Sequence, residues 1–152
     1  KAALHRGSGT LHRAFSIFLF NPQGDVLLQQ RSGQKALWPA FWSNTCCSHP
    51  YPGENPTEAA NRRLKEEMGF VTKLSSLLSF IYKAEFDNGL TEHEFDHVLI
   101  GKYSSNPIIN ELEVCDWKWI DLDVLRQDIL DNPEIYTVWF KIIFEKFYKN
   151  LK

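Results

Sequence analysis

The sequence predicts an α+β domain in which a mixed β-sheet is sandwiched between helices. Short apolar and aromatic runs separated by turn residues predict strands, and three segments with helix start signals predict helices. The chain has 152 residues, 43% of them hydrophobic and 24% charged, which fits one globular domain over residues 1–152. It contains no internal repeat, low-complexity tract or linker that would divide it.

The first strands are predicted near the amino terminus. Residues 14–20 are apolar and aromatic, residues 21–25 read Asn-Pro-Gln-Gly-Asp, and residues 26–31 form a second extended run. This order predicts a β-hairpin. The following residues, 32–52, have no clear periodicity, and we expect a long irregular segment. Loops of this length in a compact domain usually serve function.

The clearest helix is predicted over Pro56–Met68. Asn55 is a suitable N-cap, and Pro56 stands at the first helical position with Glu58 two residues later. Gly69 follows the last apolar residue and suits the left-handed conformation that ends many helices. Start and stop signals therefore agree on both ends of this helix.

The second half of the chain predicts a further hairpin, a short strand and two helices. Residues 77–85 and 92–102 flank Asp-Asn-Gly at 87–89, which is typical of a tight β-turn. Residues 117–120 form a short strand. Asp121 caps a helix to about residue 130, and the Asn-Pro-Glu at 132–134 opens a last helix to about residue 148.

Overall charge excludes several kinds of partner. The 17 Lys and Arg against 19 Asp and Glu give a net charge of −2, so we expect no nucleic acid and no anionic membrane as the main partner. No apolar run reaches the roughly 20 residues of a spanning helix. The three cysteines are an odd number and two are adjacent, which argues against a disulfide framework and favours a reducing cytoplasm.

Histidines and carboxylates offer a candidate metal site. Glu92 and Glu94 lie two apart on a predicted strand, so both point to one face, and they repel each other unless a cation or proton lies between them. With His5, His12 and His49 they would suit an octahedral divalent ion such as Mn²⁺, Mg²⁺ or Zn²⁺. The alternatives are ordinary histidines and a solvated strand face.

A second pattern lies on the predicted helix. Arg62 and Glu66, and likewise Arg63 and Glu67, are four residues apart and share a helix face, as in ordinary surface ion pairs. With its surroundings the stretch reads Glu54-x7-Arg-Arg-Leu-Lys-Glu-Glu-Met-Gly-Phe and resembles the Nudix box, which binds a diphosphate with Mg²⁺. Ser48 replaces the leading glycine of the box and Arg63 replaces a glutamate. An arginine there favours holding a diphosphate over hydrolysing it.

Longer segments resemble one family of Nudix-fold enzymes. Lys-Ala-Ala-Leu-His at 1–5, Leu-His-Arg-Ala-Phe-Ser at 11–16 and Trp-Pro-Ala-Phe-Trp-Ser-Asn-Thr-Cys-Cys-Ser-His-Pro at 38–50 resemble the type I isopentenyl-diphosphate isomerases. The resemblance implies a Nudix-like fold and the interconversion of isopentenyl and dimethylallyl diphosphate, as a step of isoprenoid biosynthesis. It implies a prenyl diphosphate as the small-molecule partner, and we expect a monomer.

The resemblance also assigns roles to individual residues. It makes Cys47 and Glu94 the catalytic pair, with Tyr82 beside Glu94, and it makes Trp139 a wall at the hydrocarbon end of the substrate. Cys46 and Cys115 match no functional position. The remaining roles are ligands of a divalent ion (His5, His12, His49, Glu92 and Glu94), a ligand of the Mg²⁺ that accompanies the substrate (Glu67) and contacts to the diphosphate (Lys1, Arg31, Lys35 and Arg63).

The implied reaction explains why these residue types are needed. A proton is added to an unactivated alkene and another is removed from the far side, through a tertiary carbocation, so an acid and a base must face each other. A free thiol, with a pKa of about 8.5, still carries its proton at neutral pH. An aromatic face can stabilise the cation without trapping it. Two alternatives stay open: a Nudix hydrolase of a nucleoside diphosphate derivative, and a non-catalytic binding module.

Overall fold

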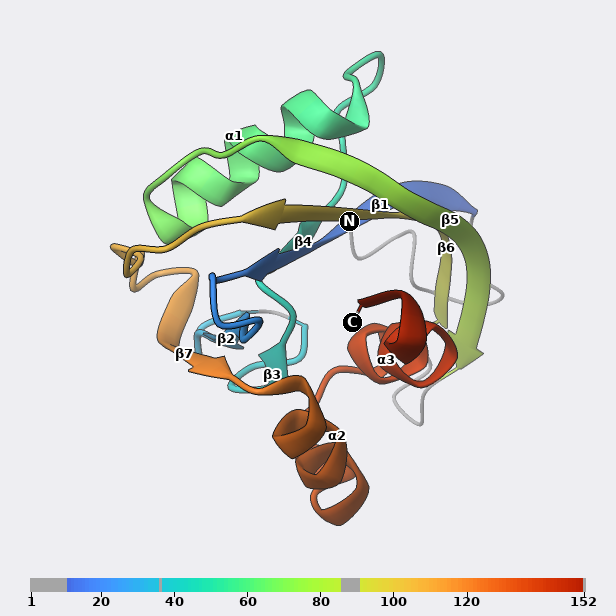
Figure 1. The fold of residues 1–152 in the computed structure, drawn as a ribbon. Helices are drawn as coiled ribbons and strands as arrows, with labels where there is room; N and C mark the ends of the chain where they lie inside the picture. Colours follow the sequence, from blue (N-terminus) through green and yellow to red (C-terminus); the bar gives the residue numbers. More distant parts are fainter. Residues whose placement is uncertain (1–10, 36, 86–90, 152) are drawn as a thin grey trace.

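The computed structural model confirms the α+β class, with a mixed seven-stranded sheet and three α-helices (Figure 1). It describes residues 11–35, 37–85 and 91–151. None of the helices in these residues is both long and apolar enough to cross a membrane. The strands are β1 (His12–Phe20), β2 (Val26–Arg31), β3 (Trp42–Ser43), β4 (Cys46–Ser48), β5 (Leu74–Glu85), β6 (Thr91–Lys102) and β7 (Val114–Ile120), and the helices are α1 (Pro56–Met68), α2 (Leu122–Asp131) and α3 (Val138–Leu151).

Strand β1 is the centre of the sheet. Along one edge it pairs in parallel with β6 over its whole length, from His12 opposite Glu94 to Phe20 opposite Lys102. It also pairs antiparallel with β2, at Phe20 and Val26, and with β4, where Ser16 lies opposite Cys47. Strands β4 and β6 therefore flank β1 on its two sides. The strand order β3-β2-β1-β6-β5 continues outward, and β7 pairs with β2.

The two faces of the sheet carry two separate hydrophobic cores. On β1, Ile17 and its odd-numbered neighbours belong to the core that includes α1, whereas Phe18 belongs to the core that includes α2 and α3. This follows from the alternation of side chains along a strand. Helix α1 covers one face, and α3 lies on the other within the curve of β5 and β6 (Figure 1). The predicted sandwich is thus confirmed.

Local signals place helix α1 at the predicted residues. The Asn55 side chain accepts a hydrogen bond from the Thr57 backbone N–H, and Pro56 is the first helical residue. Gly69 ends the helix with φ of 83°, and its N–H donates to the carbonyl of Lys65. A side chain at Gly69 would also meet the backbone: an added Cβ would lie 2.5 Å from the Ile108 carbonyl oxygen.

We expect Gly69→Ala to lower the free energy of unfolding by about 2–3 kcal/mol, because it combines a left-handed backbone with this close contact. Gly53→Ala is the matched control, since Gly53 has a similar φ of 79° but nothing within 4 Å of an added Cβ. That variant should lose only about 1 kcal/mol. Urea denaturation measures both, and equal losses would contradict the role given to Ile108.

The later strands and helix α2 are confirmed, with longer strands than predicted. Strands β5 and β6 pair antiparallel from Leu74 opposite Gly101 to Glu85 opposite Thr91, and the predicted turn at 87–89 lies outside the described residues. Strand β7 begins at Val114 rather than residue 117. The Asp121 side chain caps α2 by accepting from two backbone N–H groups.

Two predictions about local structure were wrong. The segment 32–52 contains strands β3 and β4, of two and three residues, which are too short to show a periodicity but find hydrogen-bonding partners on β2 and β1. The last helix does not begin at residue 132. Pro133–Ile135 forms a short 3₁₀ helix, Tyr136 is extended, and the Thr137 N–H donates to the Trp42 carbonyl, so α3 starts at Val138.

Candidate active site

A pocket lies on the α3 side of the sheet, over the three strands β4, β1 and β6. Cys47 comes from β4, Ser16 from β1 and Glu94 from β6, and all three line the pocket. Trp139 of α3 and Trp38 of the segment after β2 also line the pocket. Because β4 and β6 flank β1, Cys47 and Glu94 face the pocket from opposite sides of the same strand.

Three of the predicted metal ligands meet at one edge of this pocket. His12 Nε2 lies 3.0 Å from His49 Nε2 and 3.2 Å from Glu94 Oε2, and His49 Nε2 lies 2.8 Å from the same oxygen. Metal–ligand bonds of about 2.1 Å at right angles place neighbouring donor atoms about 3 Å apart. The separations fit a divalent ion held by two imidazoles and a carboxylate.

Glu94 divides its two oxygens between different partners. Oε2 faces the histidines, whereas Oε1 accepts a hydrogen bond of 2.6 Å from the Tyr82 hydroxyl. Burial raises the pKa of the Glu94 carboxyl, but the hydrogen bonds from His12, His49 and Tyr82 outweigh it and hold the pKa well below its ordinary value. The carboxylate is 6% exposed, so its charge depends on these partners.

The two adjacent cysteines point to opposite faces of β4. Cys47 packs against the core of α3 and lines the pocket, whereas Cys46 is fully buried in the core of α1. Burial is the main reason that the pKa of the Cys46 thiol is raised well above its usual value, with the Glu67 carboxylate adding to the effect. The exposed Cys115 lies on β7, where its thiol donates to the Arg31 carbonyl, and it does not line the pocket. Only Cys47 combines a thiol with access to the pocket among the described cysteines.

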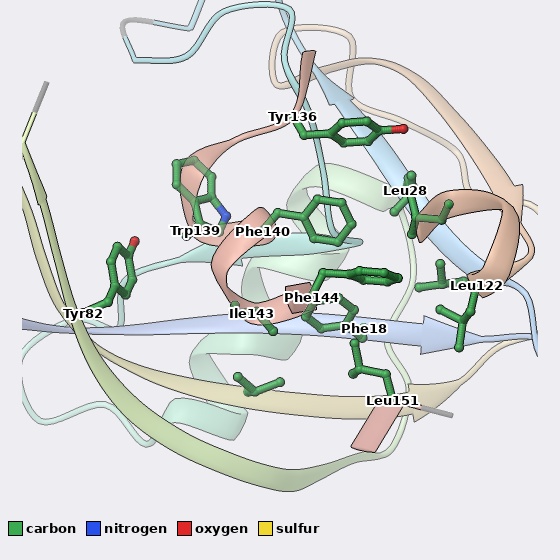
Figure 2. Close-up of a cluster of buried hydrophobic side chains, with 13 residues drawn as sticks. Phe18, Leu28, Tyr82, Leu122, Tyr136, Trp139, Phe140, Ile143, Phe144 and Leu151 are labelled. Carbon is green, nitrogen blue, oxygen red and sulfur yellow. The ribbon is translucent and has the colours of Figure 1, made fainter. Parts of the chain in front are cut away.

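Aromatic rings form one wall of the site, where Trp139 lines the pocket and Tyr82 contacts Glu94. Trp139 and Tyr82 lie at the same end of the core cluster, one from α3 and the other from β5 (Figure 2). The guanidinium carbon of Arg31 lies 5.5 Å from the centre of the Trp139 ring, so this ring already accepts a positive charge on its face.

Arg31 reaches the ring of Trp139 because strand β2 has a register shift just before it. Simple alternation along β2 would place it beside Gln29, on the α1 face, but a register shift between Gln30 and Arg31 turns it toward Trp139. Its side chain donates to the backbone carbonyls of Leu37 and Trp38. Arg31 therefore anchors the segment that carries Trp38, a residue with a positive φ of 54°.

The other predicted diphosphate-binding residues form a second cluster, between helix α1 and the segments after β2 and before β7. Arg63 donates to Glu67 at 2.5 Å and to Glu66 at 2.9 Å, and it lies 3.4 Å from Glu113. Lys35 forms an ion pair with the same Glu113. Glu67 is 3% exposed. None of these five residues is among those that line the pocket within the described part of the chain.

Some predicted site residues are not placed. Lys1 and His5 lie outside the described residues, and of Glu92 the structure gives only its position on β6, opposite Ala84. The five-ligand set is thus described for His12, His49 and Glu94 alone.

Several polar residues of the site were not predicted from the sequence. Asp96 and Ser16 are buried, line the pocket and are joined by a hydrogen bond of 2.9 Å. Asp96 continues the alternation of Glu92 and Glu94, which was the available signal. Gln29 donates to Glu67 Oε1 at 2.9 Å and to the Thr45 carbonyl, and no local pattern distinguishes it.

Comparison with known proteins identifies the class of protein to which this fold belongs. The sequence matches the NUDIX domain family over residues 10–140. The fold superimposes on the crystal structure of DR0079 from Deinococcus radiodurans with a TM-score of 0.75 and 21% sequence identity, covering 94% of this chain and 85% of that one. The molecule is therefore a Nudix-fold protein.

Curated relatives narrow the class further. "Isopentenyl-diphosphate Delta-isomerase 2" of Photorhabdus laumondii subsp. laumondii is 51% identical over 143 residues, covering 94% of this chain and 80% of the relative. The protein of the same name from Aromatoleum aromaticum is 45% identical over 146 residues, covering 96% and 77%. The chain belongs to the isopentenyl-diphosphate Delta-isomerase family.

Proposed function

We propose that this chain interconverts isopentenyl diphosphate and dimethylallyl diphosphate, with Cys47 and Glu94 as the proton-transferring pair. The observation that supports this most directly is their placement. They line one pocket from β4 and β6, on the two sides of β1, beneath the ring of Trp139. An alkene lying over β1 would have one of them on each side, as a reaction that adds and removes protons on opposite faces requires.

The residues divide the work of the reaction between them. One member of the pair donates a proton to the terminal methylene, and the other accepts a proton from the second carbon, so the double bond moves by one position. The Tyr82 hydroxyl holds Glu94 Oε1 in place at 2.6 Å. The Trp139 face can stabilise the tertiary cation by about 2 kcal/mol or more in a desolvated pocket. Trp38 and Trp139 also exclude water, which would otherwise add to the cation.

Two divalent ions belong to this proposal. His12, His49 and Glu94 would hold the first, together with His5 and Glu92, and a bound Mn²⁺, Mg²⁺ or Zn²⁺ would fix the Glu94 carboxylate and lower its proton affinity. Glu67 would hold Mg²⁺ that arrives with the substrate. Lys35 and Arg63 would contact the diphosphate, with Arg31 and Lys1 as further basic contacts.

Incubation in D₂O tests the proposed function. The protein with Mg²⁺ and isopentenyl diphosphate should produce dimethylallyl diphosphate that carries deuterium, detected by NMR or mass spectrometry. Release of phosphate from nucleoside diphosphate derivatives without any allylic product would instead indicate a hydrolase. Tight binding of the prenyl diphosphate without exchange of its protons would indicate a binding module.

Removal of metal should abolish turnover reversibly. Dialysis against a chelator empties sites built from imidazole and carboxylate, and we expect less than about 1% of activity to remain, since Glu94 loses the ion that positions it. Refilling with Mn²⁺, Mg²⁺ or Zn²⁺ one at a time, with the metal content measured in each sample, identifies the ion that restores activity. Full activity in protein shown to be free of metal would contradict the proposed metal sites.

The cysteines support a cytoplasmic location as part of this proposal. None of Cys46, Cys47 and Cys115 forms a disulfide with another described cysteine. A reducing compartment keeps the Cys47 thiol available for proton transfer. The monomeric state stays a prediction, which sedimentation analysis would test.

A further inference from the structure

Glu113 is a charged residue of the diphosphate cluster to which the proposed mechanism gives no role. It stands just before β7, and its carboxylate contacts both proposed diphosphate-binding cations: one oxygen pairs with Lys35, and the other lies 3.4 Å from Arg63 Nη2. The same Arg63 nitrogen donates to Glu67. Glu113 therefore occupies the two positive groups that a diphosphate would need.

The backbone holds Glu113 firmly in this position. Its N–H donates to the Asn110 carbonyl, and its own carbonyl accepts from the Ser32 N–H. The Lys35 N–H in turn donates to the Ser32 carbonyl. The segment that carries Lys35 is thus tied directly to the residue that carries the competing carboxylate, so the contact does not depend on two freely moving side chains.

The carboxylates of the cluster outnumber its basic groups. Three cations, Lys35, Arg62 and Arg63, are joined to four carboxylates, Glu54, Glu66, Glu67 and Glu113, which leaves a net charge of −1. Burial raises the pKa of Glu113, but Lys35 and Arg63 hold it below its ordinary value, so the carboxylate is charged at neutral pH. A diphosphate ester carries about two to three negative charges at neutral pH and would be repelled. One bound Mg²⁺ would change the net charge of the cluster from negative to positive.

We propose that Glu113 makes this cluster selective for diphosphate that arrives with Mg²⁺, because it competes with bare diphosphate for Lys35 and Arg63. When the diphosphate pairs with Lys35 and Arg63, a bound Mg²⁺ would neutralise the carboxylates of Glu113 and Glu67. Glu113 is then a positioning residue, which contacts the binding groups and not the reacting carbons. This inference rests on the proposed function only in that Lys35 and Arg63 bind the diphosphate.

Calorimetric titration with inorganic diphosphate tests the proposal without relying on turnover. The unmodified protein and Glu113→Gln are each titrated with inorganic diphosphate, once in the presence of Mg²⁺ and once with a chelator in place of Mg²⁺. The ratio of the two dissociation constants, metal-free over Mg²⁺-bound, should fall about tenfold in Glu113→Gln, because bare diphosphate no longer competes with a carboxylate. An unchanged ratio would overturn the proposal.

Two further variants separate this role from a general effect of charge. Glu66→Gln removes another carboxylate from the same Arg63, on its more exposed side and without a contact to Lys35. The ratio should change less than about twofold there, and a tenfold fall in this control would contradict a specific role for Glu113. Glu113→Asp keeps the charge and should stay within about threefold of the unmodified protein.

The outcomes distinguish this inference from the proposed function. If the unmodified protein fails to isomerise isopentenyl diphosphate, the proposed function is wrong, whatever the titrations show. If it isomerises the substrate and Glu113→Gln leaves the ratio unchanged, only the role of Glu113 is wrong. Thermal melts of each variant show that the titrated protein is folded, and the exposed quarter of the Glu113 side chain makes the isosteric change tolerable.

Discussion

Cys47→Ala should lower the turnover of isopentenyl diphosphate by about 10²- to 10⁴-fold, the range typical of a lost acid or base. The variant removes the thiol that faces the pocket from β4 while leaving the strand pairing with β1 in place. The substrate should still bind, because Cys47 is not among the residues proposed to contact the diphosphate. Steady-state kinetics should therefore show a fall in kcat with little change in KM.

Two controls show whether the loss comes from proton transfer. Cys47→Ser replaces the thiol with a hydroxyl of similar size, which holds its proton far more tightly, so we expect a loss of at least about 10²-fold. Cys115→Ala removes an exposed thiol on β7 and should keep full activity. Full turnover in Cys47→Ala would exclude the proposed pair.

Glu94→Gln should have an effect of about 10³-fold or more, because this carboxylate is both a member of the proton-transferring pair and the meeting point of the two histidines. Glutamine cannot carry a negative charge between His12 and His49, so the metal content of the purified protein should fall together with kcat. Elemental analysis of the same samples measures the metal directly. A variant that kept both its metal and its turnover would contradict the site.

The matched control for this change is Glu85→Gln, on the exposed end of β5. It removes the same charge from the same hairpin without touching the pocket, and it should keep both metal and activity. Tyr82→Phe offers an intermediate case. It removes only the hydroxyl that holds Glu94 Oε1, so we expect a loss of activity without a loss of metal.

Helix α1 could be predicted from the sequence with correct ends, whereas the Asn-Pro-Glu signal at 132–134 opened a 3₁₀ helix and not α3. Asn55, Pro56 and Gly69 act on the backbone within one turn of the helix that they bound, so α1 needed no tertiary information. The predicted antiparallel pairing of β5 with β6 is confirmed, although β5 begins at Leu74 rather than residue 77. The short strands β3 and β4 could not be found this way, because two or three residues become a strand only when β1 and β2 supply hydrogen-bonding partners.

The site shows the same division. The Nudix-like segment and the residues around Cys47 and His49 could be recognised because their spacing along the chain is distinctive. Their convergence could not be calculated from that spacing: His12, His49 and Glu94 come from three separate parts of the chain and meet because β4 and β6 flank β1. Glu113 was missed because its partners Lys35 and Arg63 are distant in sequence, whereas Asp96 could have been predicted from its alternation with Glu92 and Glu94.

The sequence by itself determined which chemical groups are present, that Arg63 and Glu67 share one helix, and the family to which the chain is related. The tertiary structure decided where those groups point. Cys46 and Cys47 are chemically identical neighbours, yet the pleat of β4 places one in the core of α1 and the other in the pocket. The register shift in β2 turns Arg31 away from Gln29 and toward Trp139. A strand has two faces, and only its packing partners determine which face becomes a site.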